Sequence, residues 1–600
     1  MSKYTSMEHL RFLLQEVHQL NELLSLEKFS HLNWEQAWMI VESAKLLADR
    51  DMAPYFKEMD RQPATYDGKG GVRTHPQFKT IIRQAADQGW ISGAAKFEHG
   101  GLQLPMMIYN AGQHIFQAAN NNCGYFSLTA GAAGLITSFG NEQQIKTFVP
   151  PMFKGLWQGT MALTEPQAGS SLSDVATNAI PVSGGMYKIK GQKIFISGGQ
   201  HDACENFVHL TLARMEGAPP GVKGISLFII PKFWPDEDGV LQDNDVFCAG
   251  DFQKMGQRGY CTTHLVFGDN DGCKGWLLGD AHKGLSYMFQ MMNESRIAVG
   301  LAAGSIAMAA YQASLHYAME RPQGRLASEK NPLQPPTMII NHPDVQRMLL
   351  TQKAIVEGAL SLVIECSRLY DLANALDGAE KQKNWLLLEI LTPIVKTYSA
   401  EQGSRSAALA IQTLGGYGFT TDFPVEQLYR DLKIMSLYEG TTGIQSIDLL
   451  GRKVTMEKGK ALKELVKAMG GTIDKANTYD ALKPYAMSLT SEVQRVQDVL
   501  SQVGKYAAEG DLDRYLSDAT IFMEMLSYSV IAWQWLKQAT IAYTQLQSSN
   551  FAMQSKEFYE GKVHTMKFFF RYELPHAEAC AKTMLDPEFL TDMKKKEILT

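Results

Sequence analysis

The chain contains 600 residues, which suggests about three to five domains of ordinary size. Hydrophobic residues make up 45% and charged residues 20%, a composition that excludes a mainly disordered or fibrous protein. With 57 Lys and Arg against 63 Asp and Glu, the formal net charge is −6, and this balance argues against a general binder of nucleic acid.

Helical periodicity fills the first part of the chain. Apolar residues recur at three- and four-residue spacing over residues 34–48 and 78–91, and residues 120–139 are apolar and small. Such spacing places one face of a helix against a core. We therefore expect an N-terminal helical extension over residues 1–34 and an N-terminal helical domain over residues 35–160.

After Thr164 the pattern becomes that of β-strands. The candidate strands show alternation with period two or are short apolar runs bounded by Gly, Pro or Asp, and they are 187–196, 207–213, 224–231 and 264–267. Several short strands with turn signals between them predict a small β domain, a barrel or sandwich, over residues 161–280.

Helical periodicity then returns and predicts a helical bundle over residues 281–455. Its candidate helices share long apolar stretches and are 287–319, 344–376, 385–413, 425–434 and 442–451. Residues 297–319 carry no Asp, Glu, Lys or Arg and are long enough to cross a membrane. Their many Gly, Ala and Ser residues favour a buried bundle helix, so we expect no integral membrane span.

A further helical region follows the bundle. The charged stretch 452–467 leads to Gly470–Gly471, which predicts a boundary before an additional C-terminal helical domain over residues 470–600. Its candidate helices are 482–508, 512–548 and 555–584. The predicted fold is therefore mainly α with a central β domain. Neither βαβ alternation nor a Gly-x-Gly-x-x-Gly turn after a strand is present, which argues against a Rossmann domain.

The cysteines and the termini bear on the compartment. Seven scattered cysteines without a Cys-x-x-Cys pair favour reduced thiols and no metal site. Residues 1–9 lack the features of a secretory signal, and the C-terminal Glu-Ile-Leu-Thr is not a peroxisomal address. We expect a cytoplasmic protein.

Two segments near the β domain offer groups for a ligand. Residues 161–171 carry the hydroxyls of Thr164 and Ser170, and Gly169 permits close backbone approach, although an ordinary turn has the same composition. Residues 193–202 end a strand with Ser197 and two glycines, which can present backbone donors to a ring system. The neighbouring His201 and Asp202 lack a nucleophile motif, so we interpret them as a surface turn.

Two further segments combine glycines with charge. Arg258 lies between two glycines, where it suits either an anion or a solvated hairpin. Glu439 follows an apolar stretch and precedes Gly440. Partial burial would raise its pKa and suit it to general-base work. The alternative is an acid stabilised by the dipole of a helix that begins at Thr441.

Together, the order and spacing of these segments resemble the acyl-CoA dehydrogenase family over roughly residues 35–455. These enzymes are flavoproteins with a helix–β–helix architecture. The matching segments are Thr-Glu-Pro-Gln-Ala-Gly-Ser at 164–170, Phe-Ile-Ser at 195–197, Lys-Met-Gly-Gln-Arg-Gly at 254–259, Gln-Thr-Leu-Gly-Gly at 412–416 and Tyr-Glu-Gly-Thr at 438–441.

The resemblance implies FAD as cofactor and Glu439 as the catalytic base. The positions that it implies for FAD are Leu163, Thr164, Ser170, Phe195, Ile196, Ser197, Arg321, Gln412, Gly415, Gly416 and Thr441. The positions that it implies for acyl-CoA are Ser170, Arg296 and Gly440. Residues 412–416 resemble the loop that reaches the flavin of a neighbouring subunit.

The sequence also departs from the common pattern. The usual Arg-x-x-Phe-Gly-Arg is shortened to Arg-Pro-Gln-Gly-Arg at 321–325, without the Phe. The residues beyond 455 and the N-terminal extension resemble a larger subgroup, which includes 3-methylmercaptopropionyl-CoA dehydrogenases and certain long-chain acyl-CoA dehydrogenases. In that subgroup a homodimer is the usual expectation.

The resemblance implies FAD-dependent α,β-dehydrogenation of an acyl-CoA thioester to trans-2-enoyl-CoA, as in fatty-acid β-oxidation. The substrate would be 3-methylmercaptopropionyl-CoA or a fatty acyl-CoA, and an electron-transferring flavoprotein would take the electrons. The alternatives are an acyl-CoA oxidase and a catalytically silent acyl-CoA-binding protein. A DNA-binding flavoprotein would need a basic groove, for which residues 452–467 supply five Lys and one Arg, but the acidic balance favours no nucleic-acid partner.

Overall fold

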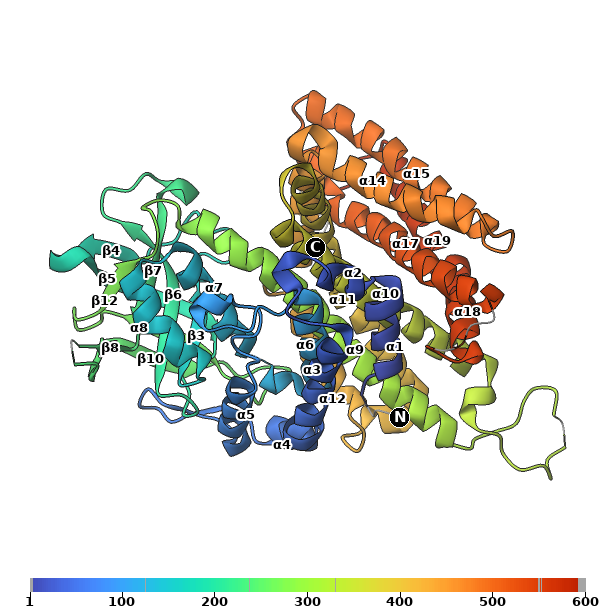
Figure 1. Cartoon of the computed structure of the whole chain (residues 1–600), viewed down its shortest axis with the longest axis horizontal. Coiled ribbons are helices and arrows are strands. Elements are labelled where there is room, and N and C mark those ends of the chain that lie inside the picture. Colours follow the sequence, from blue (N-terminus) through green and yellow to red (C-terminus); the bar gives the residue numbers. More distant parts are fainter. Residues whose placement is uncertain are drawn as a thin grey trace. The chain divides into compact units, whose positions relative to one another are not determined.

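The computed structural model describes residues 4–124, 126–236, 238–329, 331–548, 551 and 553–591. The C-terminal Glu-Ile-Leu-Thr, which we interpreted as no peroxisomal address, lies outside the described residues. The chain packs as two compact units (Figure 1). One unit spans residues 37–295, and the other combines residues 1–36 with residues 296–600.

The unit of residues 37–295 begins with helices. They are α3 (Trp34–Leu47), α4 (Phe56–Arg61), α5 (Pro76–Asp87), α6 (Met106–Asn120), α7 (Phe126–Phe139) and α8 (Glu142–Phe153). The stretch 120–139, predicted as one helix, is instead interrupted after α6. Asn120 has an extended backbone, and its side chain accepts the N–H of Asn122, so the chain turns before α7 begins.

The β domain of this unit is built mainly from one sheet. Its strands are β3 (Trp157–Ala162), β4 (Asn178–Pro181), β5 (Met186–Ser197), β6 (Asn206–Met215), β7 (Ile225–Pro231), β10 (Val246–Asp251), β11 (Thr262–Phe267) and β12 (Lys274–Leu277). Two small sheets pair β1 (Thr65–Tyr66) with β2 (Val72–Arg73) and β8 (Phe233–Pro235) with β9 (Leu241–Asp243).

The main sheet closes on itself. Its order is β10–β11–β5–β12–β7–β6–β3, and β4 pairs with both β5 and β6. The strands β4, β5, β12, β7 and β6 therefore form a ring, which confirms the predicted small barrel. Strands β3 and β4 run parallel to β6, and the other neighbours are antiparallel. In Figure 1, α7 and α8 lie beside β3.

The strand β3 could not be predicted from alternation of apolar and polar residues. Five of its six residues are buried, so the strand lacks a polar face toward solvent. The long strand β5 does alternate, as its sequence predicts, and pairs with β11 and β12. The barrel core is formed by buried apolar residues from most strands, among them Ile189, Ile196, Phe228, Ile230, Leu265 and Phe267.

The second unit is helical, as predicted. Its long central helices are α9 (Gly284–Glu320), which begins in the preceding unit, α10 (Pro343–Ala375) and α11 (Gly378–Leu414), followed by α12 (Val425–Leu432) and α13 (Thr442–Asp448). Among the described helices, α9 is long and apolar enough to cross a membrane, but 83% of its most apolar window is buried. Such burial is typical of a core helix.

The C-terminal helices pack on this bundle. They are α14 (Met456–Ala476), α15 (Lys483–Ala508), α16 (Leu512–Ser517), α17 (Ala519–Ser548), α18 (Lys556–Tyr572) and α19 (Pro575–Leu585). Gly470 and Gly471, predicted as a boundary, lie inside α14, which contacts α11, α15 and α17. Tertiary packing therefore outweighs their low helix propensity. The predicted helix 555–584 is divided at Pro575, which lacks the N–H that a continuous helix needs.

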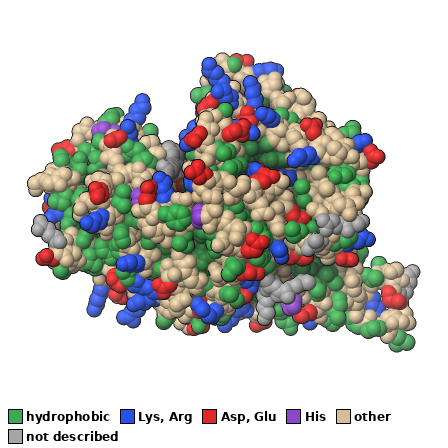
Figure 2. Space-filling view, viewed as in Figure 1, with side chains coloured by type: hydrophobic (Ala, Val, Ile, Leu, Met, Phe, Trp, Pro, Cys, Tyr) green, Lys and Arg blue, Asp and Glu red, His purple; other side chains and the backbone are tan. Residues whose placement is uncertain are grey.

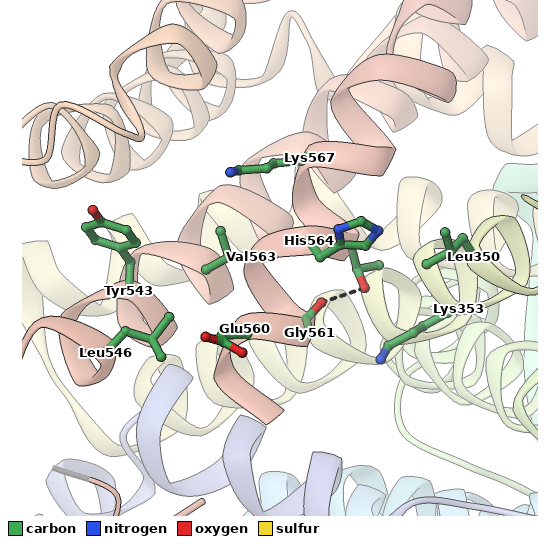
Figure 3. A pocket seen from close by; sticks show the side chains of 10 residues that line it. Leu350, Lys353, Tyr543, Leu546, Glu560, Gly561, Val563, His564 and Lys567 are labelled. Carbon is green, nitrogen blue, oxygen red and sulfur yellow. Dashed lines mark hydrogen bonds between the residues drawn. The ribbon is translucent and has the colours of Figure 1, made fainter. Parts of the chain in front are cut away.

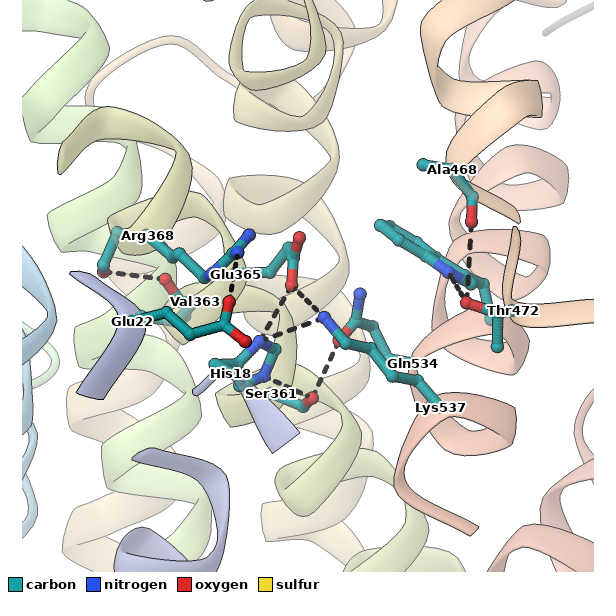
Figure 4. Close-up of polar contacts among 12 residues, drawn as sticks. His18, Glu22, Ser361, Val363, Glu365, Arg368, Ala468, Thr472, Gln534 and Lys537 are labelled. Carbon is teal, nitrogen blue, oxygen red and sulfur yellow. Dashed lines mark hydrogen bonds and ion pairs between the residues drawn. The ribbon is translucent and has the colours of Figure 1, made fainter. Parts of the chain in front are cut away.

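The N-terminal extension is docked by buried polar groups. Its helices are α1 (Met7–Phe12) and α2 (Leu20–Leu24). Between them, His18 Nδ1 lies 2.8 Å from Glu365 Oε2, and the same oxygen accepts a 2.6 Å hydrogen bond from Lys537 Nζ (Figure 4). Since Glu365 belongs to α10 and Lys537 to α17, one buried carboxylate ties together three segments far apart in the sequence.

Surface charge is mixed in sign. Figure 2 shows Lys and Arg side chains interspersed with Asp and Glu side chains over the visible face. In the basic stretch 452–467, Lys453 is buried against Glu389, and Arg452 pairs with Asp448 over 2.7 Å. Lys460 pairs with Glu457 over 3.3 Å, so three of the six basic residues in this stretch are ion-paired within the chain.

Candidate active site

Glu439 lies in a left-handed turn before α13. Its φ is +54° and that of Gly440 is +85°. A non-glycine residue in this region costs about 1–3 kcal/mol unless its surroundings hold it there. The helix is capped by Thr441, whose Oγ1 accepts the N–H of Ile444 over 3.3 Å. Glu439 therefore lies two residues before the cap of α13, close to the N-terminus of the helix whose dipole was the alternative explanation for this acid.

Buried side chains hold the backbone of this turn. Lys396 Nζ donates to the carbonyl oxygen of Gly440 over 2.7 Å, and Gln445 Nε2 donates to that of Glu439 over 2.9 Å. Thr442 Oγ1 donates to Glu401 on α11. Two helices, α11 and α13, thus fix the strained turn from two sides.

The surroundings of Glu439 set its acidity. Burial raises its pKa, while the charges of Arg296 and Lys396 oppose that rise, and the net pKa lies above the usual value. A carboxylate with a raised pKa is a stronger base than an exposed one. These properties suit a residue that removes a proton from carbon.

Arg296 is also positioned in this unit. It extends from α9, is 3% exposed, and donates from Nη1 to Asp448 Oδ2 over 2.9 Å. Its Nε is buried and has no hydrogen-bond partner among the described residues. Buried N–H groups are nearly always paired, so this donor is available to a bound molecule. The charge of Arg296 acts on Glu439, so these two predicted site residues lie in the same region of this unit.

A second group of predicted residues lies at the ends of α9 and α11. Arg321 directly follows α9, and its guanidinium lies 5.7 Å from the ring centroid of Tyr417. Gln412 is in the last turn of α11, and Gly415 and Gly416 open the next turn, where a Cβ would meet nothing within 4 Å. All of these positions are exposed. The surface here is open to a ligand or another subunit.

The predicted segments of the β domain lie together. The backbone of Ile194 donates to the carbonyl of Thr164 over 2.9 Å, which joins the segment after β3 to the end of β5. Phe195 has a φ of +59° and is 57% exposed, so its ring is presented outward. Ile196, in contrast, is 2% exposed and belongs to the barrel core. Only its backbone remains available to a cofactor.

An ion pair beneath this segment could not be recognised from the sequence. Lys193 Nζ donates to Glu165 Oε1 over 2.8 Å and to the carbonyl of Leu163 over 2.9 Å. Glu165 also accepts from Thr177 and from the N–H of Ala176. Burial raises the pKa of Glu165, but the charge of Lys193 and these hydrogen bonds outweigh burial and lower it. The available signal was a lysine within an apolar strand.

Two candidates from the sequence do not form reactive groups. His201 is 1% exposed, which corrects its interpretation as part of a surface turn, and burial lowers its pKa to about 4. Asp202 accepts instead from the N–H and hydroxyl of Thr74. The guanidinium of Arg258 lies 3.9 Å from Asp60 Oδ2, so a carboxylate of the chain itself faces this cation.

A separate pocket of about 470 Å³ lies among α10, α17 and α18 (Figure 3). Lys353, His564 and Lys567 are among the residues that line it, and none of the predicted site residues does. Within the described residues, no group of three or more His, Cys, Asp or Glu could hold a metal ion.

Comparison with protein-family models covers most of the chain. Models of the acyl-CoA dehydrogenase N-terminal, middle and C-terminal domains match residues 35–156, 160–270 and 282–454. A model described as acetyl-CoA dehydrogenase C-terminal like matches residues 465–591. The chain belongs to the acyl-CoA dehydrogenase family. Members of this family are FAD-dependent oxidoreductases.

Two relatives match this chain over nearly its full length. The chain is 34% identical over 573 residues to a 3-methylmercaptopropionyl-CoA dehydrogenase of Ruegeria pomeroyi, with 95% of each chain covered. It is 33% identical over 577 residues to a broad-specificity linear acyl-CoA dehydrogenase of Mycobacterium tuberculosis, with 94% of each covered. These full-length matches confirm the resemblance to the larger subgroup and support acyl-CoA dehydrogenase activity.

The same architecture occurs in a solved structure. An acyl-CoA dehydrogenase of Bacillus anthracis, complexed with FAD, aligns with a TM-score of 0.72 over 96% of this chain and 91% of its own, at 20% identity. This likeness confirms the acyl-CoA dehydrogenase fold of helical, β and helical domains with additional C-terminal helices.

The two units each offer groups that fit FAD. In the β domain, the exposed ring of Phe195 and the exposed Ser170 lie on segments that the backbone joins. In the helical unit, Gly415 and Gly416 allow close backbone approach, and the exposed Arg321 offers a planar cation of the kind that binds phosphate. The residues present are therefore compatible with the cofactor of the family.

Proposed function

We propose that the chain oxidises a linear acyl-CoA thioester between its α- and β-carbons to the trans-2-enoyl-CoA, with Glu439 as the base. The observation that carries this proposal is the partly buried setting of Glu439, in which desolvation raises its pKa against the opposing charges of Arg296 and Lys396. When bound, FAD supplies the acceptor for the electron pair that leaves the substrate.

The proton of the α-carbon is transferred to the carboxylate of Glu439. This carbon is a very weak acid, so negative charge that develops on the thioester oxygen must be stabilised. The backbone N–H of Glu439 has no hydrogen-bond partner within the part of the chain that the structure describes. In our proposal it donates to that oxygen, and one such donor in a dry site is typically worth about 3–4 kcal/mol.

Binding of the reactants is assigned to the remaining predicted residues. In our proposal, Ser170, Arg296 and Gly440 contact the acyl-CoA. The residues that hold FAD are Leu163, Thr164, Ser170, Phe195, Ile196, Ser197, Arg321, Gln412, Gly415, Gly416 and Thr441. The unpartnered Nε of Arg296 supports a polar contact in the helical unit.

The proposal extends to partners and compartment. We assign a homodimer in which the loop of residues 412–416 meets the neighbouring subunit, an electron-transferring flavoprotein as the acceptor, and a cytoplasmic role in β-oxidation. Exposed apolar side chains beside the loop, Tyr417 and the 90% exposed Phe419, support a protein contact at this surface. The similarity to a 3-methylmercaptopropionyl-CoA dehydrogenase supports our inclusion of that thioester among the candidate substrates.

The experiment is anaerobic titration of the purified holoenzyme. A panel of acyl-CoA thioesters, from butyryl to palmitoyl and including 3-methylmercaptopropionyl, is added while flavin absorbance is followed. We expect bleaching by at least one linear thioester and reoxidation by an electron-transferring flavoprotein. Absence of bleaching across the panel would contradict the proposal. Rapid formation of hydrogen peroxide in air would identify an oxidase instead.

A further inference from the structure

Lys396 is a buried cation with an unusual partner. It is 0% exposed, and its Nζ donates to the carbonyl oxygen of Gly440 over 2.7 Å. Within the described residues, no carboxylate lies within ion-pair distance of this ammonium group. Other buried lysines differ in this respect, because Lys193 pairs with Glu165 and Lys562 with Glu357, each over 2.8 Å. Burying a charged group without a carboxylate partner costs free energy of folding. We therefore expect Lys396 to have a role that offsets this cost.

The carbonyl that Lys396 binds belongs to the strained turn. Glu439 and Gly440 both have positive φ, and the carbonyl of Glu439 is held separately by Gln445 Nε2. The backbone on both sides of the Glu439–Gly440 peptide is therefore fixed by buried donors. Without Lys396, the Gly440 carbonyl would lose its donor, and the turn would be free to relax toward less strained φ values.

The charge of Lys396 also acts on Glu439. Burial lowers the pKa of Lys396 to about 8, and the charges of Glu439 and Glu401 oppose that change. At neutral pH the ammonium form therefore predominates. The charged groups that surround this pair come from three helices: Arg296 on α9, Glu401 on α11 and Asp448 on α13. Arg296 forms an ion pair with Asp448, and Glu401 accepts a hydrogen bond from the hydroxyl of Thr442.

We propose that Lys396 is a positioning residue for the base, which fixes the Glu439–Gly440 turn through the Gly440 carbonyl and supplies a positive charge that favours the ionised Glu439. This inference rests on the proposed function of Glu439. It assigns to α11 a role in the reaction, although Lys396 itself does not touch the reacting atoms.

The test compares Lys396→Met, Lys396→Gln and Lys396→Arg holoenzymes with Lys562→Met. Lys562 is a matched control because it is also buried, has a pKa lowered to about 8, and lies on α18 against Glu357. The anaerobic rate of flavin bleaching is measured from pH 5.5 to 9 at saturating and limiting acyl-CoA. Bound flavin and the thermal midpoint are recorded for every variant.

In Lys396→Met we expect the saturating rate at pH 7 to fall about 10- to 100-fold, as for a misplaced reacting group. The apparent pKa of the rate profile should rise by about one unit or more, because an opposite charge has been removed. Lys396→Gln retains an N–H donor without the charge, so its profile should also shift upward. If Lys396→Met does not fold, the Lys396→Gln variant provides the test in its place. Lys396→Arg should restore the profile toward wild type.

Hydrogen exchange gives a readout that does not depend on turnover. Amides of residues 437–442 should exchange faster in Lys396→Met than in wild type or Lys562→Met. A wild-type pH profile together with unchanged exchange in Lys396→Met would overturn the inference. The outcome is separable from the proposed function: if Glu439→Gln also bleaches normally, the base assignment fails, whereas if only the Lys396 variants behave as wild type, the positioning role alone fails.

Discussion

The ammonium group of Lys193 lies 2.8 Å from Glu165 Oε1, and the two side chains are 0% and 2% exposed. Lys193 comes from β5, and Glu165 follows β3 in the segment assigned to FAD. The same ammonium group also binds the carbonyl of Leu163. One buried cation therefore holds the backbone and the acidic side chain of this segment.

Replacing Lys193 with Met should leave Glu165 buried and unpaired. We expect a loss of about 3–5 kcal/mol in the free energy of unfolding and weaker retention of FAD, measured by denaturant unfolding and by flavin content after gel filtration. The matched control is Lys190→Met, on the same strand, whose pair with Asp271 is exposed. It should change neither quantity appreciably. Equal stability of the two variants would contradict the role of the buried pair.

Buried histidines should make the fold acid-sensitive. Burial lowers the pKa of His18, His114 and His201 to about 4 and that of His209 to about 3. Because these folded-state pKa values lie below the ordinary 6.5, the unfolded chain binds more protons between these limits. The contribution of these neutral histidines to the free energy of unfolding is therefore fully present above pH 6.5 and is lost as the pH falls toward 4. Each proton contributes a slope of about 1.4 kcal/mol per pH unit.

The histidine effect can be isolated at His201, whose ring makes edge contacts with Phe78 and Phe207. His201→Phe keeps an aromatic ring there and should reduce the slope of unfolding free energy against pH by one proton, measured in urea between pH 6.5 and 4.5. His316 is exposed, so His316→Gln should retain the wild-type slope. A wild-type slope in His201→Phe would show that this ring is not the neutral buried group described.

The loop after α11 should contribute to the homodimer that we propose. Phe419 is 90% exposed, and burying its ring against another subunit would remove a large apolar side chain from water. We expect Phe419→Lys to shift the protein toward monomer in light-scattering measurements and to weaken FAD retention. Met487 on α15 is also exposed, and Met487→Lys serves as the control. An unaltered dimer in Phe419→Lys would place the interface elsewhere.

The sequence predicts helices, strands and motifs whose residues are contiguous in the chain. The alternation over β5 and the apolar periods of α10 and α11 indicate the elements correctly. An acid flanked by apolar residues and a glycine is the pattern from which Glu439 is predicted as the base. The strand β3 is missed because it is buried on both faces, and the glycines in α14 mislead because packing, not propensity, decides that helix.

Groups that act through tertiary contacts could not be predicted. Lys396 lies in an apolar run of α11 and meets the Gly440 carbonyl only when α11 packs against the turn. The same holds for His18, which reaches Glu365 and Lys537 after the N-terminal extension docks. The sequence contains these residues but gives no local signal for the distant partner that determines what each one does.

The central claim is that Glu439 removes the α-proton, and replacement by Gln tests it most directly. The amide keeps the size of the side chain but cannot accept the proton, so the anaerobic bleaching rate should fall by about 10²- to 10⁴-fold while FAD stays bound. Glu426→Gln, which removes a carboxylate paired with Arg430, is the control and should bleach at the wild-type rate. A near-normal rate in Glu439→Gln, with flavin content intact, would contradict the account.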